Sequence, residues 1–164
     1  MKKIEIPDQD TIDLHIYMKG IRGDLIASVI NLESVMNLFL ARHFCGHSEE
    51  KITESIEMIF STTKLTLDNK REIILGIMQK HFVDKKYTQA LNKSLQKIIE
   101  CRNIFAHHEY DGSDKAKTFF RKEKTIQFIK YKNAKIYEPF TTNQISDIKF
   151  DIHVTTERLM ALIE

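Results

Sequence analysis

Apolar residues recur every three or four positions over most of this chain, which is the spacing that puts them on one face of an α-helix. The first clear stretch covers residues 24–44, and further ones cover residues 48–60, 68–82 and 88–107. The pattern predicts four amphipathic helices that each bury one face. The residues expected on these faces are Leu25, Val29, Leu32, Met36, Phe39, Leu40, Ile52, Ile56, Ile59, Phe60, Ile73, Ile74, Ile77, Met78, Leu91, Leu95, Ile98 and Phe105.

Capping residues and breakers indicate where some of these helices begin or end. Ser48 and Asp68 stand at the expected starts of the second and third helices. At such a position a side-chain oxygen can accept a backbone N–H that the helix leaves free. Residues 12–18 predict a further short helix, and Gly20 and Gly23 are expected to end it.

The period of the pattern changes near the C-terminus. Residues 118–140 include an alternating segment from Thr125 to Lys130, which predicts a small β-hairpin. Residues 142–163 return to helical spacing, with Ile145, Ile148, Ile152, Leu159 and Ile163 on one face. We therefore predict an all-α bundle of about five helices with a β-hairpin between the last two. One domain covers residues 1–164, with residues 1–23 as an N-terminal extension or short helix.

Composition agrees with a globular protein and leaves the partner open. The 164 residues are 42% hydrophobic and 29% charged, a balance typical of one folded domain. No apolar run approaches the roughly 20 residues that cross a bilayer, and the first residues lack the apolar core of a signal peptide. We expect a soluble, cytoplasmic protein with no membrane partner and with Cys45 and Cys101 reduced. The net charge of +2 is compatible with RNA binding but does not indicate it.

One charged residue interrupts the apolar face of the fourth helix. On an ideal helix, Leu91, Leu95, Ile98 and Phe105 fall within an arc of roughly 80°, and Arg102 falls near its middle. Desolvating a guanidinium costs several kcal/mol, roughly, unless it is paired or faces a wet crevice. Either Arg102 pairs with Glu33 inside the bundle, or the face opens there into a cleft or subunit interface where Arg102 meets a phosphate. The two interpretations can hold together.

Asn103 and His107 lie beside this arginine. They are four residues apart and can therefore contact the same ligand from one flank of the helix. Arg102 and His107 are roughly 140° apart on an ideal helix, so one rigid helix does not direct both at one atom. Either the helix loosens there, or two copies face each other across a two-fold axis and build a composite cleft. We predict a homodimer on that ground.

The segment from Arg102 to His107, with sequence Arg-Asn-Ile-Phe-Ala-His, resembles the R-N-x-x-A-H form of the R-x(4-6)-H motif of HEPN domains (higher eukaryotes and prokaryotes nucleotide-binding). The layout of a late helix, a hairpin and a terminal helix resembles that family from about residue 24 to residue 164. The resemblance implies an up-and-down helical bundle that dimerises with the motif at its interface. It also implies, for many members, a metal-independent endoribonuclease in toxin–antitoxin, abortive-infection, phage-defence or RNA-processing systems.

The resemblance assigns roles to the motif residues. His107 would be the general acid or base, because imidazole can accept and donate a proton near neutral pH. Arg102 would stabilise the phosphorane and Asn103 would orient His107 or the phosphate. His108 and Tyr110 also fit the spacing range, as in members that end in H-x-Y, although the position of Tyr110 is offset by one residue. We favour His107, and keep Glu33, His108 and Tyr110 as supporting candidates.

The expected partners are RNA, a second copy of the chain and a cognate antitoxin protein, with no cofactor or metal. A non-catalytic HEPN module that binds a nucleotide, an RNA or a protein is the alternative, and a purely structural bundle is a third possibility. The basic residues Arg121, Lys122 and Lys124 either bind an RNA backbone or form a solvated edge of the hairpin. The cluster of His43, Cys45 and His47 does not have the usual spacing of zinc ligands, so we assign no metal to it.

Overall fold

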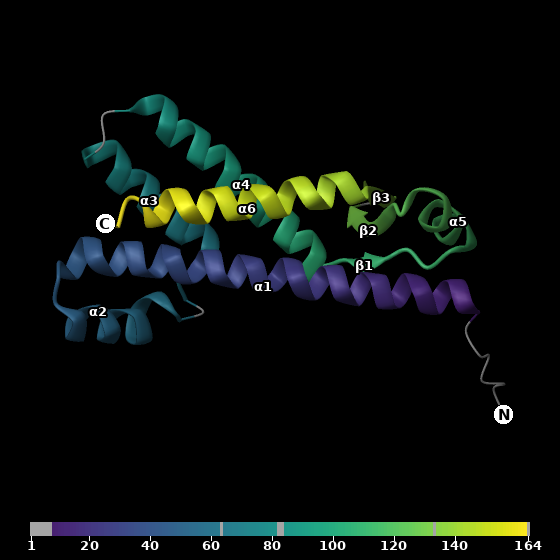
Figure 1. Cartoon of the computed structure of the whole chain (residues 1–164), viewed down its shortest axis with the longest axis horizontal. Coiled ribbons are helices and arrows are strands. Elements are labelled where there is room, and N and C mark those ends of the chain that lie inside the picture. The colour runs from purple at the N-terminus through teal and green to yellow at the C-terminus, as the bar shows by residue number, and fades with distance from the viewer. Residues whose placement is uncertain (1–7, 63, 82–83, 133, 164) are drawn as a thin grey trace.

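The computed structural model describes residues 8–62, 64–81, 84–132 and 134–163. Its elements are α1 (Gln9–Cys45), α2 (Glu49–Ser55), the π-helix η1 (Ile56–Phe60), α3 (Leu67–His81), α4 (Lys85–His107), β1 (Glu109–Tyr110), α5 (Asp114–Glu123), β2 (Ile126–Lys132), β3 (Ala134–Phe140) and α6 (Thr142–Met160). The helices α1, α2, α3, α4 and α6 alternate in direction along the bundle (Figure 1). The predicted class is confirmed: a helical bundle with a hairpin before its last helix.

Helix α1 is longer than the sequence pattern suggested. The prediction of a separate helix at residues 12–18 is wrong, because α1 continues through Gly20 and Gly23 without a break. Each glycine costs a helix only about 1 kcal/mol. Leu14 and Met18 are both buried in the core, so their packing offsets that cost. By length and composition α1 could also cross a membrane, a test that the core helix of a bundle passes as well.

The second helical segment changes its hydrogen-bond pattern halfway along. Its last turn, η1, is a π-helix, which rotates the side chains that follow relative to an α-helix. Phe60 is therefore buried as predicted, but Ile59 is 55% exposed. Ser48 holds the N-cap position of α2 without a side-chain cap bond. The cap predicted for α3 is wrong by two residues, because the hydroxyl of Thr66, not Asp68, accepts the free backbone N–H there.

Helices α3, α4 and α6 meet α1 in one core, and their predicted faces are correct. Among their predicted apolar residues, Ile73 and Ile163 are partly buried, and the others are buried. Asp84 caps α4 by accepting hydrogen bonds from two backbone N–H groups. The start of α6 is closed by a reciprocal capping box between Thr141 and Gln144.

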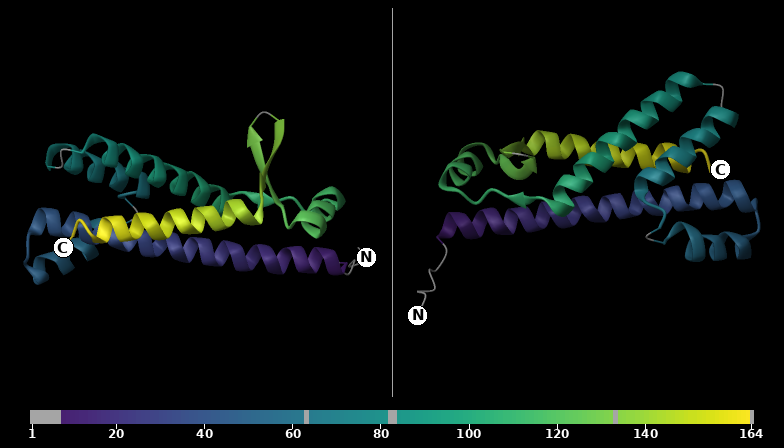
Figure 2. Two further views of the ribbon diagram at one scale, coloured as in Figure 1. Left: turned by 45° about the horizontal axis from the view of Figure 1, so that its top comes forward. Right: turned by 180° about the vertical axis from the view of Figure 1, so that it is seen from behind.

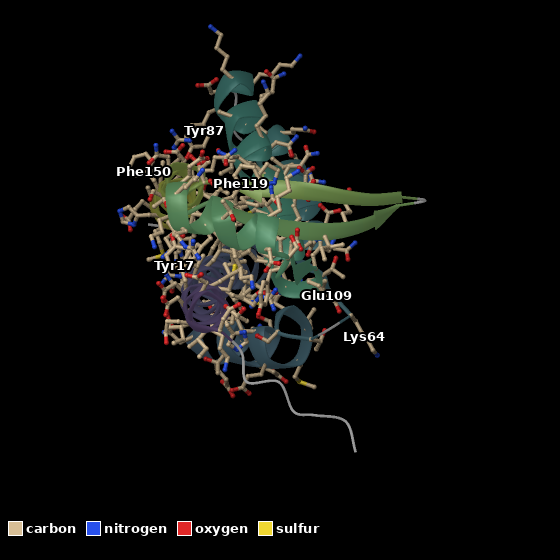
Figure 3. All side chains as sticks on the ribbon, turned by 90° about the vertical axis from the view of Figure 1, so that its right-hand side faces the viewer. Tyr17, Lys64, Tyr87, Glu109, Phe119 and Phe150 are labelled. Carbon is tan, nitrogen blue, oxygen red and sulfur yellow. The ribbon has the colours of Figure 1, made fainter. Side chains whose placement is uncertain are left out.

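The sheet has three antiparallel strands in the order β1-β2-β3. The hairpin of β2 and β3 projects from the bundle (Figures 2 and 3), and the short strand β1 was not predicted. Residues 118–123 also differ from the prediction, since they belong to α5. The signals of that helix are Ser113, whose hydroxyl caps it, and the buried Ala116 and Phe120 four residues apart. Residue 133 of the predicted hairpin and residue 82 of the predicted third helix lie outside the described residues.

Candidate functional site

The motif occupies the last two turns of α4, and one of its side chains packs against the sheet. Phe105, in the middle of the motif, is fully buried, and its ring lies 4.7 Å from that of Phe128 and 5.2 Å from that of Phe140. The helix ends after His107, because His108 is extended and its N–H donates to the carbonyl of Ile104. Buried packing on one side thus leaves the opposite side of the turn accessible.

Three side chains of the motif meet on that accessible side. The Nη1 atom of Arg102 donates to Oδ1 of Asn103 at 3.1 Å and lies 3.5 Å from Nε2 of His107. A guanidinium can only donate, so a hydrogen bond across this contact depends on the tautomer of the ring and requires Nε2 to carry no proton. His107 itself is exposed to solvent, and Arg102 is half-buried. The arrangement joins a fixed positive charge, an amide and an imidazole within one small area.

This geometry corrects one expectation from the sequence. We expected the roughly 140° between Arg102 and His107 to require a loosened helix or a second copy. Neither is needed, because α4 remains helical to His107 and the long arginine side chain spans the angle between the two positions. The site is therefore assembled within one chain, and the helical angle no longer argues for a dimer.

Arg102 lines a groove of about 600 Å³ between α1, α4 and the turn that precedes α3. Asn103 and Ile99 belong to its α4 wall, and Glu33 and Asp68 belong to the other walls. We call it the Arg102 groove. Of the two interpretations of Arg102, the structure therefore has the open cleft.

The alternative of an ion pair between Glu33 and Arg102 is not the arrangement that the structure has. Glu33 accepts from the ammonium of Lys70, which is only 1% exposed and so has the stronger need of a counter-charge. Sequence reasoning missed Lys70, although the signal was present. Lys70 lies four residues before Ile74 and seven before Ile77, so a charge stands on the apolar face of α3 just as Arg102 does on that of α4.

The structure also shows the surroundings of Cys101, which precedes Arg102, and of His43, which lies near the end of α1. Burial raises the pKa of the Cys101 thiol to about 12, so this neighbour of Arg102 stays protonated. The ring of His43 packs against Phe44 and against His81, with ring centroids 5.0 and 5.3 Å away. Within the described ranges, no three His, Cys, Asp or Glu side chains come together as a metal site would require.

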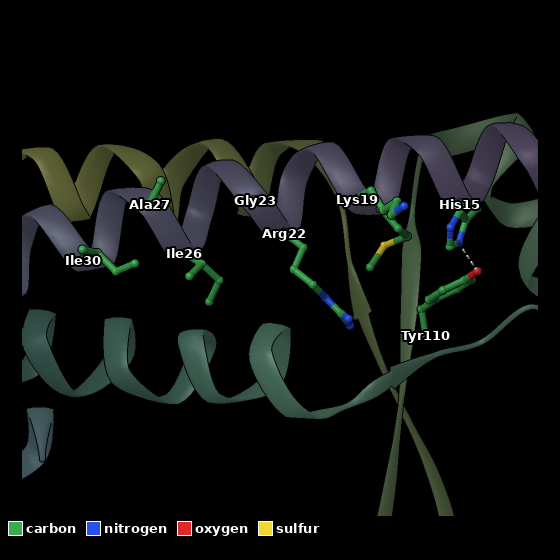
Figure 4. A pocket seen from close by; sticks show the side chains of 9 residues that line it. His15, Lys19, Arg22, Gly23, Ile26, Ala27, Ile30 and Tyr110 are labelled. Atoms are coloured by element: carbon green, nitrogen blue, oxygen red, sulfur yellow. Dashed lines mark hydrogen bonds between the residues drawn. The ribbon is translucent and has the colours of Figure 1, made fainter. Parts of the chain in front are cut away.

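His108 and Tyr110 face a different part of α1 from the motif triad. Arg22 donates from Nη2 to the backbone carbonyl of His108 at 2.8 Å. The hydroxyl of Tyr110 and Nδ1 of His15 are hydrogen-bonded at 2.9 Å (Figure 4). Of the two candidate histidines, His107 is the one in contact with Arg102.

A second groove, of about 580 Å³, lies along α1 beside Tyr110 (Figure 4). Sequence reasoning missed its lining residues, which include His15, Met18, Lys19, Arg22, Gly23, Ile26 and Ile30. We call it the Tyr110 groove. The missed signal is Arg22, which falls between Met18 and Leu25 on the buried face of α1 once the helix is taken to begin near residue 9.

The basic residues that follow the motif do not join it. Arg121 is paired with Asp10, and the ammonium of Lys124 lies 4.4 Å from the centre of the Phe120 ring. Lys122 is exposed on α5. None of the three lines the Arg102 groove or the Tyr110 groove. The positions of Arg102, Asn103 and His107 therefore give no support to the prediction that these three basic residues bind RNA.

Comparison of the chain with protein-family models, with curated proteins and with solved structures finds no match in any of the three. Membership of the HEPN family therefore stays a prediction from the motif and the layout of the helices. Arg102, Asn103 and His107 are in contact at the end of α4, and this contact is the structural feature that bears on function.

Proposed function

We propose that this chain is a metal-independent endoribonuclease of the HEPN type, with Arg102, Asn103 and His107 as its catalytic residues. The observation that carries the proposal is the contact of one guanidinium with both other side chains on an accessible turn. A phosphodiester cleavage that starts from the ribose 2′-hydroxyl needs a group that moves protons and a fixed positive charge at the phosphorus. The triad contains both.

In the proposed reaction, His107 removes the proton of the 2′-hydroxyl. The 2′-oxygen forms a bond to phosphorus while the bond from phosphorus to the 5′-oxygen breaks. The proton held by the imidazolium is then available to the leaving 5′-oxygen, so atoms and charges balance. The products are a 2′,3′-cyclic phosphate and a 5′-hydroxyl end.

Arg102 stabilises the negative charge that builds up on the phosphorane oxygens, because its planar fork matches their geometry. Asn103 accepts a hydrogen bond from Arg102, which holds the guanidinium beside His107. Its amide nitrogen can donate to a phosphate oxygen at the same time. Asn103 is thus both a positioning residue and a ligand of the phosphate in this mechanism.

The biological setting stays a prediction from the family resemblance. A toxin or phage-defence effector would work with a cognate antitoxin protein, and the homodimer would place two copies of the motif at one cleft. A non-catalytic module that binds RNA, a nucleotide or a protein partner through the same residues is the alternative. Cleavage of RNA distinguishes the two functions, because only the enzyme would cut the RNA that it binds.

The test is RNA cleavage by the purified full chain in excess EDTA. We expect cleavage with 2′,3′-cyclic phosphate ends and a loss of at least about 100-fold in rate for His107→Ala, since a general acid or base contributes about that much or more. His108→Ala is the matched control and should keep most of the activity, because the contact with Arg102 belongs to His107.

Thermal melts of each variant confirm that it is folded. Equal losses in the two histidine variants would remove the assignment to His107. A folded parent protein that binds RNA without cutting it would contradict the enzyme and support the binding module.

A further inference from the structure

The two grooves follow one seam between α1 and the motif. Along α1, Glu33 shares the Arg102 groove with Asn103, Arg22 contacts His108, and His15 contacts Tyr110. Helix α1 therefore passes the motif from one end to the other. Ile26 lines the Tyr110 groove, and it lies seven residues before Glu33, which is two turns along the same helix face. The two grooves thus lie along the same helix, one beside Tyr110 and the other beside Arg102, and a strand that follows α1 would pass both.

Charge distinguishes the two grooves. The Tyr110 groove has His15, Lys19 and Arg22 among its lining residues and no carboxylate. The Arg102 groove has Glu33 and Asp68. The cations along the Tyr110 groove therefore attract a polyanion that is held at the motif. In the Arg102 groove, Glu33 and Asp68 are paired with Lys70 and Arg71, so that groove has no comparable set of cations beyond Arg102 among its described lining residues.

Apolar side chains make up much of the lining of the Tyr110 groove. Met18, Ile26 and Ile30 line it together with the ring of Tyr110, whose hydroxyl is held by His15 (Figure 4). A volume of about 580 Å³ lies within the usual range for sites of small organic groups. Nucleobases stack on aromatic side chains, and their faces are suited to an apolar surface with a cationic rim.

We propose that the Tyr110 groove binds an unpaired nucleobase of single-stranded RNA next to the scissile phosphate. The base stacks on Tyr110, and Lys19 binds a flanking phosphate. This inference rests on the proposed ribonuclease function and specifies its substrate. Since a base within a duplex cannot enter the groove, the strand must be unpaired at the cut.

A second copy of the chain is the other occupant that an apolar groove on a helix could accept. Self-association of this face would bring Lys19 and Arg22 of two copies together without an acidic partner among the lining residues. Like charges across an interface oppose association. The cations therefore favour an anionic ligand.

Two glycines of α1 offer a matched pair of test variants. A Cβ atom added at Gly23 or at Gly20 meets nothing within 4 Å, so both positions accept a side chain. Gly23 lines the Tyr110 groove, and Gly20, one turn away, does not. Gly23→Leu should fill the groove while Gly20→Leu leaves it open.

The experiment measures the affinity of a fluorescent single-stranded oligoribonucleotide in EDTA, in a His107→Ala background that prevents cleavage. Single abasic residues replace each base next to the mapped cut in turn. We expect one abasic position to weaken binding by about tenfold, as the loss of one stacked base does. Gly23→Leu and Tyr110→Ala should weaken binding of the intact RNA to a similar degree and abolish the abasic difference. Gly20→Leu should change it by less than twofold.

The outcomes separate the inference from the proposed function. RNA that is cut by the parent chain and bound equally with and without each base would overturn the groove and leave the ribonuclease. A Gly23→Leu variant that dissociates a dimer in sedimentation and binds RNA normally would assign the groove to a second copy. A parent chain that neither binds nor cuts RNA would overturn both.

Discussion

At the scale of single residues, Lys70 places a charged ammonium group in the core. Its side chain is 1% exposed and that of its partner Glu33 is 34% exposed. We predict that Glu33→Gln lowers the free energy of unfolding by about 1–3 kcal/mol, because it leaves a buried ammonium without its counter-charge. The lower part of that range reflects the solvent that reaches Glu33. Urea denaturation measures the change.

A second substitution tests the cause of that loss. Lys70→Met removes the buried charge and keeps an unbranched side chain, so it should restore most of the stability of the Glu33→Gln variant. A double variant as unstable as Glu33→Gln alone would contradict the ion pair as the source. Cleavage activity that is unchanged in Glu33→Gln would also exclude Glu33 from the mechanism.

At the scale of elements, α6 depends on a local hydrogen-bonded start. The hydroxyl of Thr141 accepts from the N–H of Gln144 at 3.2 Å, and Oε1 of Gln144 accepts from the N–H of Thr141 at 2.8 Å. We predict that Thr141→Ala lowers the free energy of unfolding by about 1 kcal/mol, the usual effect of losing an N-cap. Asn143→Ala is the control, since Asn143 is exposed in the same turn. An equal loss in both variants would show that the effect is not due to the cap.

At the scale of the whole molecule, one aromatic cluster joins the motif to the sheet. Phe105 packs on Phe128 and Phe140, so the end of α4 and the base of the hairpin stabilise each other. We predict that Phe105→Ala costs about 3–5 kcal/mol in unfolding free energy, as truncation of a fully buried phenylalanine does. Chemical denaturation measures it. Phe150→Ala on α6 is the control, because that ring is 66% exposed and should change stability by less than about 0.5 kcal/mol.

The same aromatic packing leads to a prediction about activity. If Phe105 holds the motif turn in place, Phe105→Ala should reduce the proposed cleavage under conditions where the variant remains folded. A variant that is destabilised but cleaves RNA at the parent rate would show that the site does not depend on this packing.

The sequence by itself determined the features that depend on neighbours within a helix. The apolar face of α4, its end at His107 and the burial of Phe105 all follow from local spacing. So does the proximity of Asn103 and His107, which are one turn apart. The arginine on the apolar face was visible in the same way, and the groove beside it was one of two expected explanations.

The tertiary structure alone decided the features that depend on distant segments. Local helix propensity predicts that α1 ends at its two glycines. Burial of Leu14 and Met18 stabilises the helix on the N-terminal side of these glycines, so α1 continues through them. Lys70 is more deeply buried than Arg102, and it is the residue that forms the ion pair with Glu33. The length of the Arg102 side chain allows it to reach His107 although the two positions point in different directions on the helix. The Tyr110 groove exists because Arg22 and His15 meet residues more than eighty positions away. Spacing along the sequence allowed Glu33 to pair with more than one cation. The packed core decides which pair forms, because burial and the cost of desolvating a charge depend on all the segments that surround it.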